Sequence, residues 1–310
     1  MTRLAMLLLA ACFVTASGAS YAASTTFTTI DNPGDPTFNQ LLGINNAGMI
    51  VGYFGSGAAG HPNQAYTLSP PYTTFAPSNV PGSAQTQVTA LNNTGTKVGF
   101  FTGSNTGTDS DFGFISWHDN GVERLLLVNN HGTGGATLVN QVLGVNDGNI
   151  AVGFYVDGNG ASHGYSYTVA TANFMPVTIP GATSVTATGI NTGNLICGAY
   201  VNAKGRTLGF TKPMAGGVTV SFQTPGSANT QLLGINKHGI AVGFFADATG
   251  VDHGLLYNPA NGNWQQVDDP NAPMGTVLNG LNDKGEAVGF YTDAAGNVHG
   301  MLVTGLPSQL

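Results

Sequence analysis

The stretch GINKHGIAVGFFADATGVDHGLLY, residues 234–257, alternates short apolar segments with two Gly-containing turns. Apolar, β-branched and aromatic residues in short runs predict β-strands, and the turns NKHG and DATG predict tight reversals between them. Near copies stand at 144–167 and at 280–302. A stretch that recurs in this way predicts a repeat architecture in which each copy builds the same group of strands.

The repeat has a core motif: a small residue, an apolar residue and Asn, then a Gly turn, then Val-Gly-aromatic or a close variant. It occurs six times, with successive Asn residues 47, 54, 45, 45 and 46 positions apart. The asparagines are Asn45, Asn92, Asn146, Asn191, Asn236 and Asn282. The glycines that follow them are Gly52, Gly99, Gly153, Gly198, Gly243 and Gly289. We expect both sets to be structural, because the scaffold needs them in every copy.

Each copy contains the signals of four strands, which in one copy are expected at 231–236, 240–246, 252–258 and 264–268. Six such units predict an all-β, six-bladed β-propeller of four-stranded antiparallel blades. The last unit ends after its third strand, and a spare strand is expected at 25–31. Pairing of that N-terminal strand with the last unit closes the predicted ring and removes an exposed sheet edge.

The first 22 residues have the features of a secretory signal peptide: Arg3, an apolar run, and Ser20 and Ala22 before a cleavage site. The alternative is a lipoprotein signal with an anchor at Cys12, which the short apolar run before it disfavours. We expect a single propeller domain at 23–305, a C-terminal tail at 306–310, and a secreted or periplasmic location. No later stretch approaches the ~18 apolar residues that a membrane-spanning helix needs.

The composition limits the partners of the chain. Charged residues make up 7% and hydrophobic residues 42% of the sequence, which contains 46 glycines. Removal of Arg3 leaves 7 basic and 15 acidic residues, a net charge of −8. A nucleic-acid site needs clustered positive charge, and the sequence has none, so neither nucleic acid nor an anionic membrane surface is expected as a partner. We expect a monomer.

Repeated glycine within strands indicates a close approach by another group. A second glycine column follows in the third strand of each unit except the first, which has Ala65. Its members are Gly113, Gly164, Gly209, Gly254 and Gly300. We expect aromatic side chains of the neighbouring blade to press on the glycines of both columns.

Cys197, the cysteine that remains after cleavage, stands in a column otherwise occupied by Val, and we expect it to be a small buried apolar side chain.

The stretches GINNAGMIVGYF, VDHGLLY and FTTIDNPG resemble the bacterial extracellular repeats named for a His-Ala-Phe motif. The corresponding triplets here begin at His163, His253 and His299 and continue with Gly and a third residue that varies. The resemblance covers nearly the whole chain after the signal. It implies an exported, propeller-like repeat protein, and it carries no catalytic residues to transfer.

His163, His253 and His299 occupy one column, in the third strands of three different units. Metal ligands must lie about 2.0–2.1 Å from one ion, and side chains on separate blades cannot converge in that way. We therefore expect no metal, and a half-buried imidazole that bonds the neighbouring turn. A sugar contact repeated in each unit is the alternative.

Turns that begin with Asp or Asn and carry Gly at the fourth position follow the second strands at 157–160, 202–205, 247–250 and 293–296. This pattern is typical of a type I turn followed by a left-handed residue. A calcium loop needs more oxygen ligands and a late bidentate carboxylate. We expect no cofactor, with one weak calcium site at 157–160 as the alternative.

The repeat is broken by two expansions, at 102–112 and 129–140, which account for the spacing of 54 residues. In a propeller both would lie on one face, at one blade and the junction after it. They offer Asp109, Asp111, Asn130 and His131 as ligand-binding candidates beside the channel. The alternative is a tolerated surface insertion.

Two classes of function follow. The scarcity of Glu, Lys and Arg favours a binding or scaffold module for a glycan or a cell-envelope partner, because catalytic sites usually need perturbed titratable groups. The alternative is an enzyme that cleaves a polysaccharide or an ester at the channel mouth. A purely structural role is a third reading.

Overall fold

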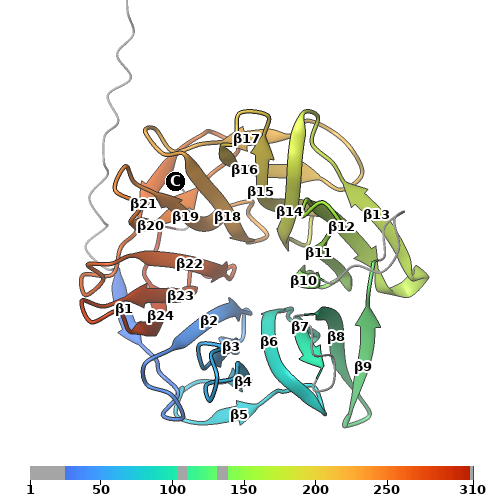
Figure 1. Ribbon diagram of the computed structural model, residues 1–310, viewed down its shortest axis with the longest axis vertical. Coiled ribbons are helices and arrows are strands. Elements are labelled where there is room, and N and C mark those ends of the chain that lie inside the picture. Colours follow the sequence, from blue (N-terminus) through green and yellow to red (C-terminus); the bar gives the residue numbers. More distant parts are fainter. Residues whose placement is uncertain (1–24, 104–109, 131–138, 308–309) are drawn as a thin grey trace, which may run out of the picture.

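The computed structural model describes residues 25–103, 110–130, 139–307 and 310. Its regular elements are β-strands, apart from one short 3₁₀ turn, η1 (Val169–Thr171). The strands form a β-propeller arrangement in which consecutive groups of strands follow one another around a centre (Figure 1). Each group corresponds to one copy of the sequence repeat, and we number these groups as units 1 to 6.

The units are built from the following strands. Unit 1 contains β2 (Asn39–Ile44), β3 (Ile50–Phe54), β4 (Gln64–Leu68) and β5 (Phe75–Pro77). Unit 2 contains β6 (Ser83–Leu91), β7 (Lys97–Gly103), β8 (Asp111–Asp119) and β9 (Val122–Val128). Unit 3 contains β10 (Asn140–Val145), β11 (Ile150–Val156), β12 (Ser162–Thr168) and β13 (Asn173–Val177).

Unit 4 contains β14 (Ala182–Ile190), β15 (Leu195–Asn202), β16 (Thr207–Pro213) and β17 (Val220–Phe222). Unit 5 contains β18 (Asn229–Ile235), β19 (Ala241–Ala246), β20 (Asp252–Tyr257) and β21 (Trp264–Gln266). Unit 6 contains β22 (Thr276–Leu281), β23 (Ala287–Thr292) and β24 (Val298–Thr304), and β1 (Thr26–Thr29) lies beside it (Figure 1).

The sheets differ from the prediction in one respect. Units 1, 2 and 3 and unit 6 with β1 are separate four-stranded sheets, but units 4 and 5 form a single eight-stranded sheet. The expectation of six separate sheets is therefore wrong for this part of the chain. The physical reason is one parallel pair between Thr207 and Asn229, supported by a bond of 3.1 Å from the Thr207 amide to the Ala228 carbonyl.

The N-terminal strand lies where the sequence placed it. β1 pairs antiparallel with β24, with Thr26 opposite Thr304 and Thr29 opposite Met301. The Ile30 amide continues the ladder with a bond of 2.8 Å to the Gly300 carbonyl. The two ends of the described chain therefore meet in one sheet.

The glycines of the second strands have a different cause from the one predicted. In all six units the first strand has a bulge at the same position, for example between Leu232 and Gly234. The second-strand glycine lies opposite this bulge, where a Cβ would overlap a first-strand carbonyl of its own unit, as between Gly243 and Gln231. The expectation of aromatic side chains from the next blade is wrong here, because a backbone carbonyl already occupies the space.

The glycines of the third strands do meet the next unit, but through aliphatic rather than aromatic side chains. A Cβ on Gly209 would lie 2.8 Å from Leu232 Cγ, and one on Gly113 would lie 2.8 Å from Val142 Cγ2. Leu232 and Val142 are fully buried residues of the innermost strands. Aliphatic contacts suit this position because the inner strands converge, which leaves little room for a ring.

The hydrophobic core is divided among the junctions between neighbouring units. One cluster joins Val242 and Leu256 of unit 5 to Leu278 and Met301 of unit 6. Another joins residues of unit 1 to Val288 and Leu302 of unit 6. Each unit therefore depends on its neighbours to bury its apolar faces, which explains why a repeat of this kind needs several copies.

Cys197 is fully buried and is a free thiol. Burial raises the pKa of the Cys197 thiol to about 12, so it is uncharged and unreactive at neutral pH. The expectation of a small buried apolar side chain is confirmed.

We predict that Gly243→Ala lowers the free energy of unfolding by roughly 2 kcal/mol or more, because its Cβ would meet backbone that cannot move away. Gly158→Ala is the matched control: nothing lies within 4 Å of its Cβ position, so its effect should stay within about 0.5 kcal/mol. Chemical denaturation of both variants checks the prediction. Equal stability of the two variants would contradict the role assigned to the bulge.

Candidate functional site

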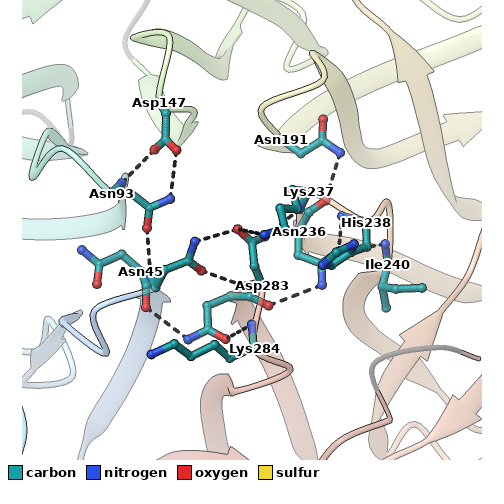
Figure 2. A network of polar contacts seen from close by, with 12 residues as sticks. Asn45, Asn93, Asp147, Asn191, Asn236, Lys237, His238, Ile240, Asp283 and Lys284 are labelled. Atoms are coloured by element: carbon teal, nitrogen blue, oxygen red, sulfur yellow. Dashed lines mark hydrogen bonds and ion pairs between the residues drawn. The ribbon is translucent and has the colours of Figure 1, made fainter.

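The repeated asparagines form a continuous cycle of hydrogen bonds around the centre of the molecule. The Nδ2 of each donates to the backbone carbonyl of the corresponding asparagine in the next unit, and the last bond leads from Asn282 back to Asn45. Figure 2 shows part of this cycle, with the bond from Asn191 to Asn236. The six donor–acceptor distances are 3.2, 2.9, 3.1, 2.9, 3.4 and 3.1 Å. All six asparagines are buried.

The other end of each amide group closes the local turn. In Asn191, for example, Oδ1 accepts the backbone amides of Gly193 and Leu195, at 2.9 and 3.0 Å. The other five asparagines accept the amides two and four positions later in the same way. One side chain thus fixes a turn of its own unit and attaches it to the next. The sequence identified these residues as structural, and the structure supplies the reason.

A second layer of polar residues lies beside this cycle at the channel mouth. Asn46, Asn93 and Asp283 each donate their backbone amide to the side chain at the same position of the next unit, as from Asn93 to Asp147 (Figure 2). Asn46 Nδ2 also donates to Asp283 Oδ2, at 2.6 Å. The Lys237 Nζ lies 3.7 Å from Asp283 Oδ2. These groups surround a hollow of about 80 Å³ and bond mainly to one another. Their polar atoms therefore stabilise the contacts between units.

The Asp turns have the geometry predicted for them. Asp157 Oδ1 accepts the amides of Asn159 and Ala161, at 2.9 and 3.0 Å, and Gly160 has a positive φ of 84°. The turns that begin at Asp247 and Asp293 repeat these bonds. Within the described part of the chain, no group of three or more His, Cys, Asp or Glu side chains is placed to hold a metal ion.

The histidine column makes more bonds than the sequence analysis expected. His253 Nδ1 lies 2.8 Å from Asp268 and its Nε2 lies 3.5 Å from Asp247. His299 is held in the same way, with Nδ1 2.7 Å from Asp31 and Nε2 3.2 Å from Asp293. The expected bond to the neighbouring turn is present. The second carboxylate was missed, although both Asp-Asp-Pro and Asp-Asn-Pro were visible at the ends of fourth strands.

These carboxylates change the titration of the two imidazoles. Burial by itself lowers the pKa of His253, but the hydrogen bonds and charges of Asp268 and Asp247 outweigh it and raise the pKa. Burial likewise lowers the pKa of His299, but the hydrogen bonds and charges of Asp31 and Asp293 outweigh it, and the pKa is raised. The backbone amide of Asn297 is the main reason that the pKa of Asp293 falls to about 2, and His299 adds to the effect.

The predicted ligand-binding candidates fall in two groups. Asp109 and His131 lie outside the described residues. Asp111 begins β8 and lines a pocket of about 270 Å³ between units 1, 2 and 3. Asn130 lines a different pocket, of about 430 Å³, between units 3 and 4. The structure thus places Asp111 and Asn130 at two separate hollows.

The pocket at Asp111, which we call the amide pocket, is lined by carboxamides and two phenylalanines. Its lining is Asn63, Gln85, Thr86, Gln87, Phe100, Phe101, Thr102, Asp111 and Gln141. Gln141 Nε2 donates to Asp111 Oδ2 at 2.6 Å, and Gln87 Nε2 donates to Asn63 Oδ1 at 2.9 Å. Among the described residues, Oε1 of Gln87, Oε1 of Gln141 and Nε2 of Gln85 have no partner. Two acceptors and one donor are therefore available to a ligand.

The larger pocket, which we call the His163 pocket, is lined by both apolar and polar residues. Its apolar residues include Phe174, Pro176 and Val185, and its polar residues include Ser162 and Ser184. His163 stacks on Tyr155 with ring centroids 5.0 Å apart. The volume of the His163 pocket lies within the range of roughly 300–1,000 Å³ typical of small-molecule sites. The sequence analysis did not identify this pocket, because its lining comes from strand positions that look like ordinary scaffold.

No helix in the described part of the chain is both long and apolar enough to cross a membrane.

Comparisons with known proteins place the fold and nothing finer. No protein-family model and no curated protein matches the chain. The resemblance to His-Ala-Phe repeats therefore stays a prediction. Among solved structures, an arginine-to-alanine triple mutant of AofleA from Arthrobotrys oligospora is similar with a TM-score of 0.55 and 12% identity, over 90% of this chain and 86% of that chain.

Two further solved structures are similar over most of this chain. TolB from Acinetobacter baumannii has a TM-score of 0.51 and 10% identity, over 88% of this chain and 65% of that chain. Trypanosoma rangeli sialidase in complex with 2,3-difluorosialic acid has a TM-score of 0.50 and 10% identity, over 92% of this chain and 59% of that chain. The chain thus spans less than two thirds of the TolB and sialidase chains. At these identities the likeness shows the propeller-like fold alone.

We predict that Asn191→Ala lowers the free energy of unfolding by roughly 1–3 kcal/mol, because a buried donor bond is lost and two partly buried amides lose their acceptor. Its exposed neighbour Thr192 provides the control, and Thr192→Ala should change stability by less than about 0.5 kcal/mol. Denaturant unfolding measures both. A loss of stability in Asn191→Ala no greater than in the control would show that the cycle contributes little.

We predict that the two Asp–His–Asp groups stabilise the fold most between about pH 4 and pH 6.5. A raised histidine pKa gives stability that is complete below the unfolded value near 6.5 and is lost as the pH rises through the folded value. A lowered Asp293 pKa, from 3.8 to about 2, gives stability that is lost as the pH falls through that range.

The double variant His253→Gln, His299→Gln should therefore lose roughly 1–3 kcal/mol per histidine at pH 5.5 and much less at pH 9, measured by urea unfolding. His163→Gln is the control, since His163 has one carboxylate partner and is 44% exposed, and its loss should be smaller. An equal loss at both pH values would contradict the assignment.

Proposed function

We propose that the chain is an exported six-bladed β-propeller that acts as a binding module, with a glycan bound at the amide pocket. Six blades follow if the eight-stranded sheet is divided at its one parallel residue pair, because units 4 and 5 each retain four antiparallel strands. The pairing of β1 with β24 and the asparagine cycle through all six units support a closed ring.

Export rests on the sequence alone. The N-terminal segment 1–22 has the charged, apolar and small-residue parts of a signal peptide, and the low content of charged residues and abundance of Asn and Thr agree with an extracellular or periplasmic protein. Cleavage after Ala22 is the proposed processing event, with a lipid anchor at Cys12 as the disfavoured alternative. A glycan of the cell envelope is the partner that such a location provides.

The observation that carries the function is the set of amide atoms in the amide pocket that have no partner among the described residues. Sugar hydroxyls both donate and accept hydrogen bonds, and a planar carboxamide offers one group of each kind. Gln85, Gln87 and Gln141 provide the donor and the two acceptors, and Phe100 and Phe101 provide apolar surface. The bond between Gln141 and Asp111 fixes the direction of one amide before a ligand arrives.

Catalysis at the same pocket has less support. Hydrolysis of a glycosidic bond commonly uses two carboxyl groups that flank the bond, and Asp111 is the one carboxylate among the described lining residues. Asp111 is also bonded to Gln141 and Thr102, which favours a fixed anion over a proton donor. The sialidase among the similar structures is an enzyme, but its fold does not transfer an activity.

We predict that Gln141→Ala weakens binding of a neutral polysaccharide at least tenfold, because it removes a ligand acceptor and releases Asp111. Gln231→Ala is the matched control: Gln231 occupies the same position of the first strand in unit 5, on the far side of the ring. A glycan array followed by isothermal titration calorimetry of the purified chain measures the effect. Equal loss in both variants would place the site elsewhere, and no glycan ligand at all would overturn the proposed function.

A further inference from the structure

One of the three column histidines lacks a partner that the other two have. His253 and His299 each place Nδ1 within 2.8 Å of a fourth-strand carboxylate, Asp268 or Asp31. His163 bonds Asp157 through Nε2 at 2.8 Å, and its Nδ1 has no partner among the described residues. Its side chain is 44% exposed, compared with 23% for His253 and 18% for His299.

The strand register identifies the residue that replaces the missing carboxylate. Asp268 follows Val267, which pairs with Gly254, and Asp31 follows Ile30, which pairs with Gly300. In unit 3 the partner of Gly164 is Val177, so the corresponding position is Thr178. Thr178 lines the His163 pocket. The pocket therefore lies where units 5 and 6 hold an aspartate against their histidine.

The chemistry of the pocket indicates which molecules could supply that carboxylate. Among the described residues its lining contains no Asp, Glu, Lys or Arg, so a ligand carboxylate would meet His163 as its cationic partner. Four residues with hydroxyl side chains line the pocket, Ser162, Thr178, Thr183 and Ser184, and Phe174 and Pro176 offer apolar surface. Hydroxyl groups suit a polyhydroxylated ring, and flat apolar side chains suit its C–H face.

We propose that the His163 pocket binds a sugar acid, a hexuronic acid or its glycoside, whose carboxylate takes the position that Asp268 and Asp31 occupy in units 5 and 6. Unit 6 contains the same arrangement, because His299 lies between two carboxylates at 2.7 and 3.2 Å. The site is separate from the amide pocket, and the inference does not depend on a glycan being bound there.

Such binding takes up a proton. With Nε2–H directed to Asp157, a neutral His163 has a lone pair at Nδ1, which repels a carboxylate, whereas the imidazolium has N–H at both positions. The groups that face His163 are Asp157 from the turn after β11 and Tyr155 from β11. Affinity for a carboxylate should therefore be higher where the imidazole is protonated than where it is neutral.

The test uses sodium glucuronate and glucose as matched probes in calorimetric titrations of the full chain at pH 5.5 and pH 8.5. We expect glucuronate to bind at pH 5.5, at least tenfold more weakly at pH 8.5, and at least tenfold more tightly than glucose. Thr178→Asp should abolish this binding, because the new carboxylate fills the position on His163. Thr178→Asn, which has nearly the shape of Asp but no charge, should retain more of the affinity than Thr178→Asp.

The controls separate this inference from the proposed function and from misfolding. Gln141→Ala should leave glucuronate binding unchanged, since Gln141 lies in the amide pocket. Circular dichroism and the melting temperature establish that Thr178→Asp is folded. His163→Gln provides a second variant, which should lose the affinity for glucuronate over glucose and its pH dependence together. Equal binding of glucose and glucuronate, or undiminished binding by folded Thr178→Asp, would overturn the proposal.

Discussion

The cycle of asparagine amides is the interaction on which the rest of the structure depends. A carboxamide is the smallest side chain that offers an acceptor and a donor pointing in different directions, and here the two ends serve different units. Oδ1 closes the turn after the first strand, and Nδ2 reaches the carbonyl of the next unit's asparagine. Aspartate could close the turn but could not donate, and serine could not reach the neighbouring unit. The requirement is therefore for asparagine in every unit.

The cycle also requires the inner strands to lie close together, and the glycines follow from this. Gly43, Gly144, Gly189, Gly234 and Gly280 of the first strands lie against the backbone of the next inner strand, where a Cβ on Gly43 would approach Ala90 Cα within 2.9 Å. The bulge beside each of them turns one residue toward the channel and leaves space for glycine alone on the second strand. The asparagine, the bulge and the two glycines thus form one geometric unit, and the sequence repeats them together.

Much of this architecture could be predicted from the sequence, because periodic patterns report local structure directly. The unit at 231–268 shows this: four strands were expected there, and β18 to β21 lie within two residues or so of the expected ranges. The pairing partner of the N-terminal strand was also correct. The sequence did not allow us to predict which atoms fill the space at each glycine. That depends on the bulge register, and a bulge changes which residues face each other without changing the apolar pattern.

The candidate site was predicted less completely, for a related reason. Inserted segments are visible in a sequence, and they led to Asp111 and Asn130, which the structure places at two pockets. The His163 pocket arises from the opposite kind of change, in which Thr178 stands where two other units have aspartate. Recognising that substitution needs the register of the fourth strand, whose sequence varies most between units.

The site that we propose at His163 lies where one unit of the scaffold differs from two others. In the Asp–His–Asp groups of units 5 and 6, both nitrogens of each imidazole already have an aspartate oxygen as partner. In unit 3, where Thr178 replaces the carboxylate, His163 is still held by Asp157 of its turn and by Tyr155. Its Nδ1 has no partner among the described residues. Such a group is fixed in orientation before any ligand arrives, which reduces the entropic cost of binding. The carboxylates that bond the histidines of units 5 and 6 thus indicate the kind of ligand group that we propose for unit 3.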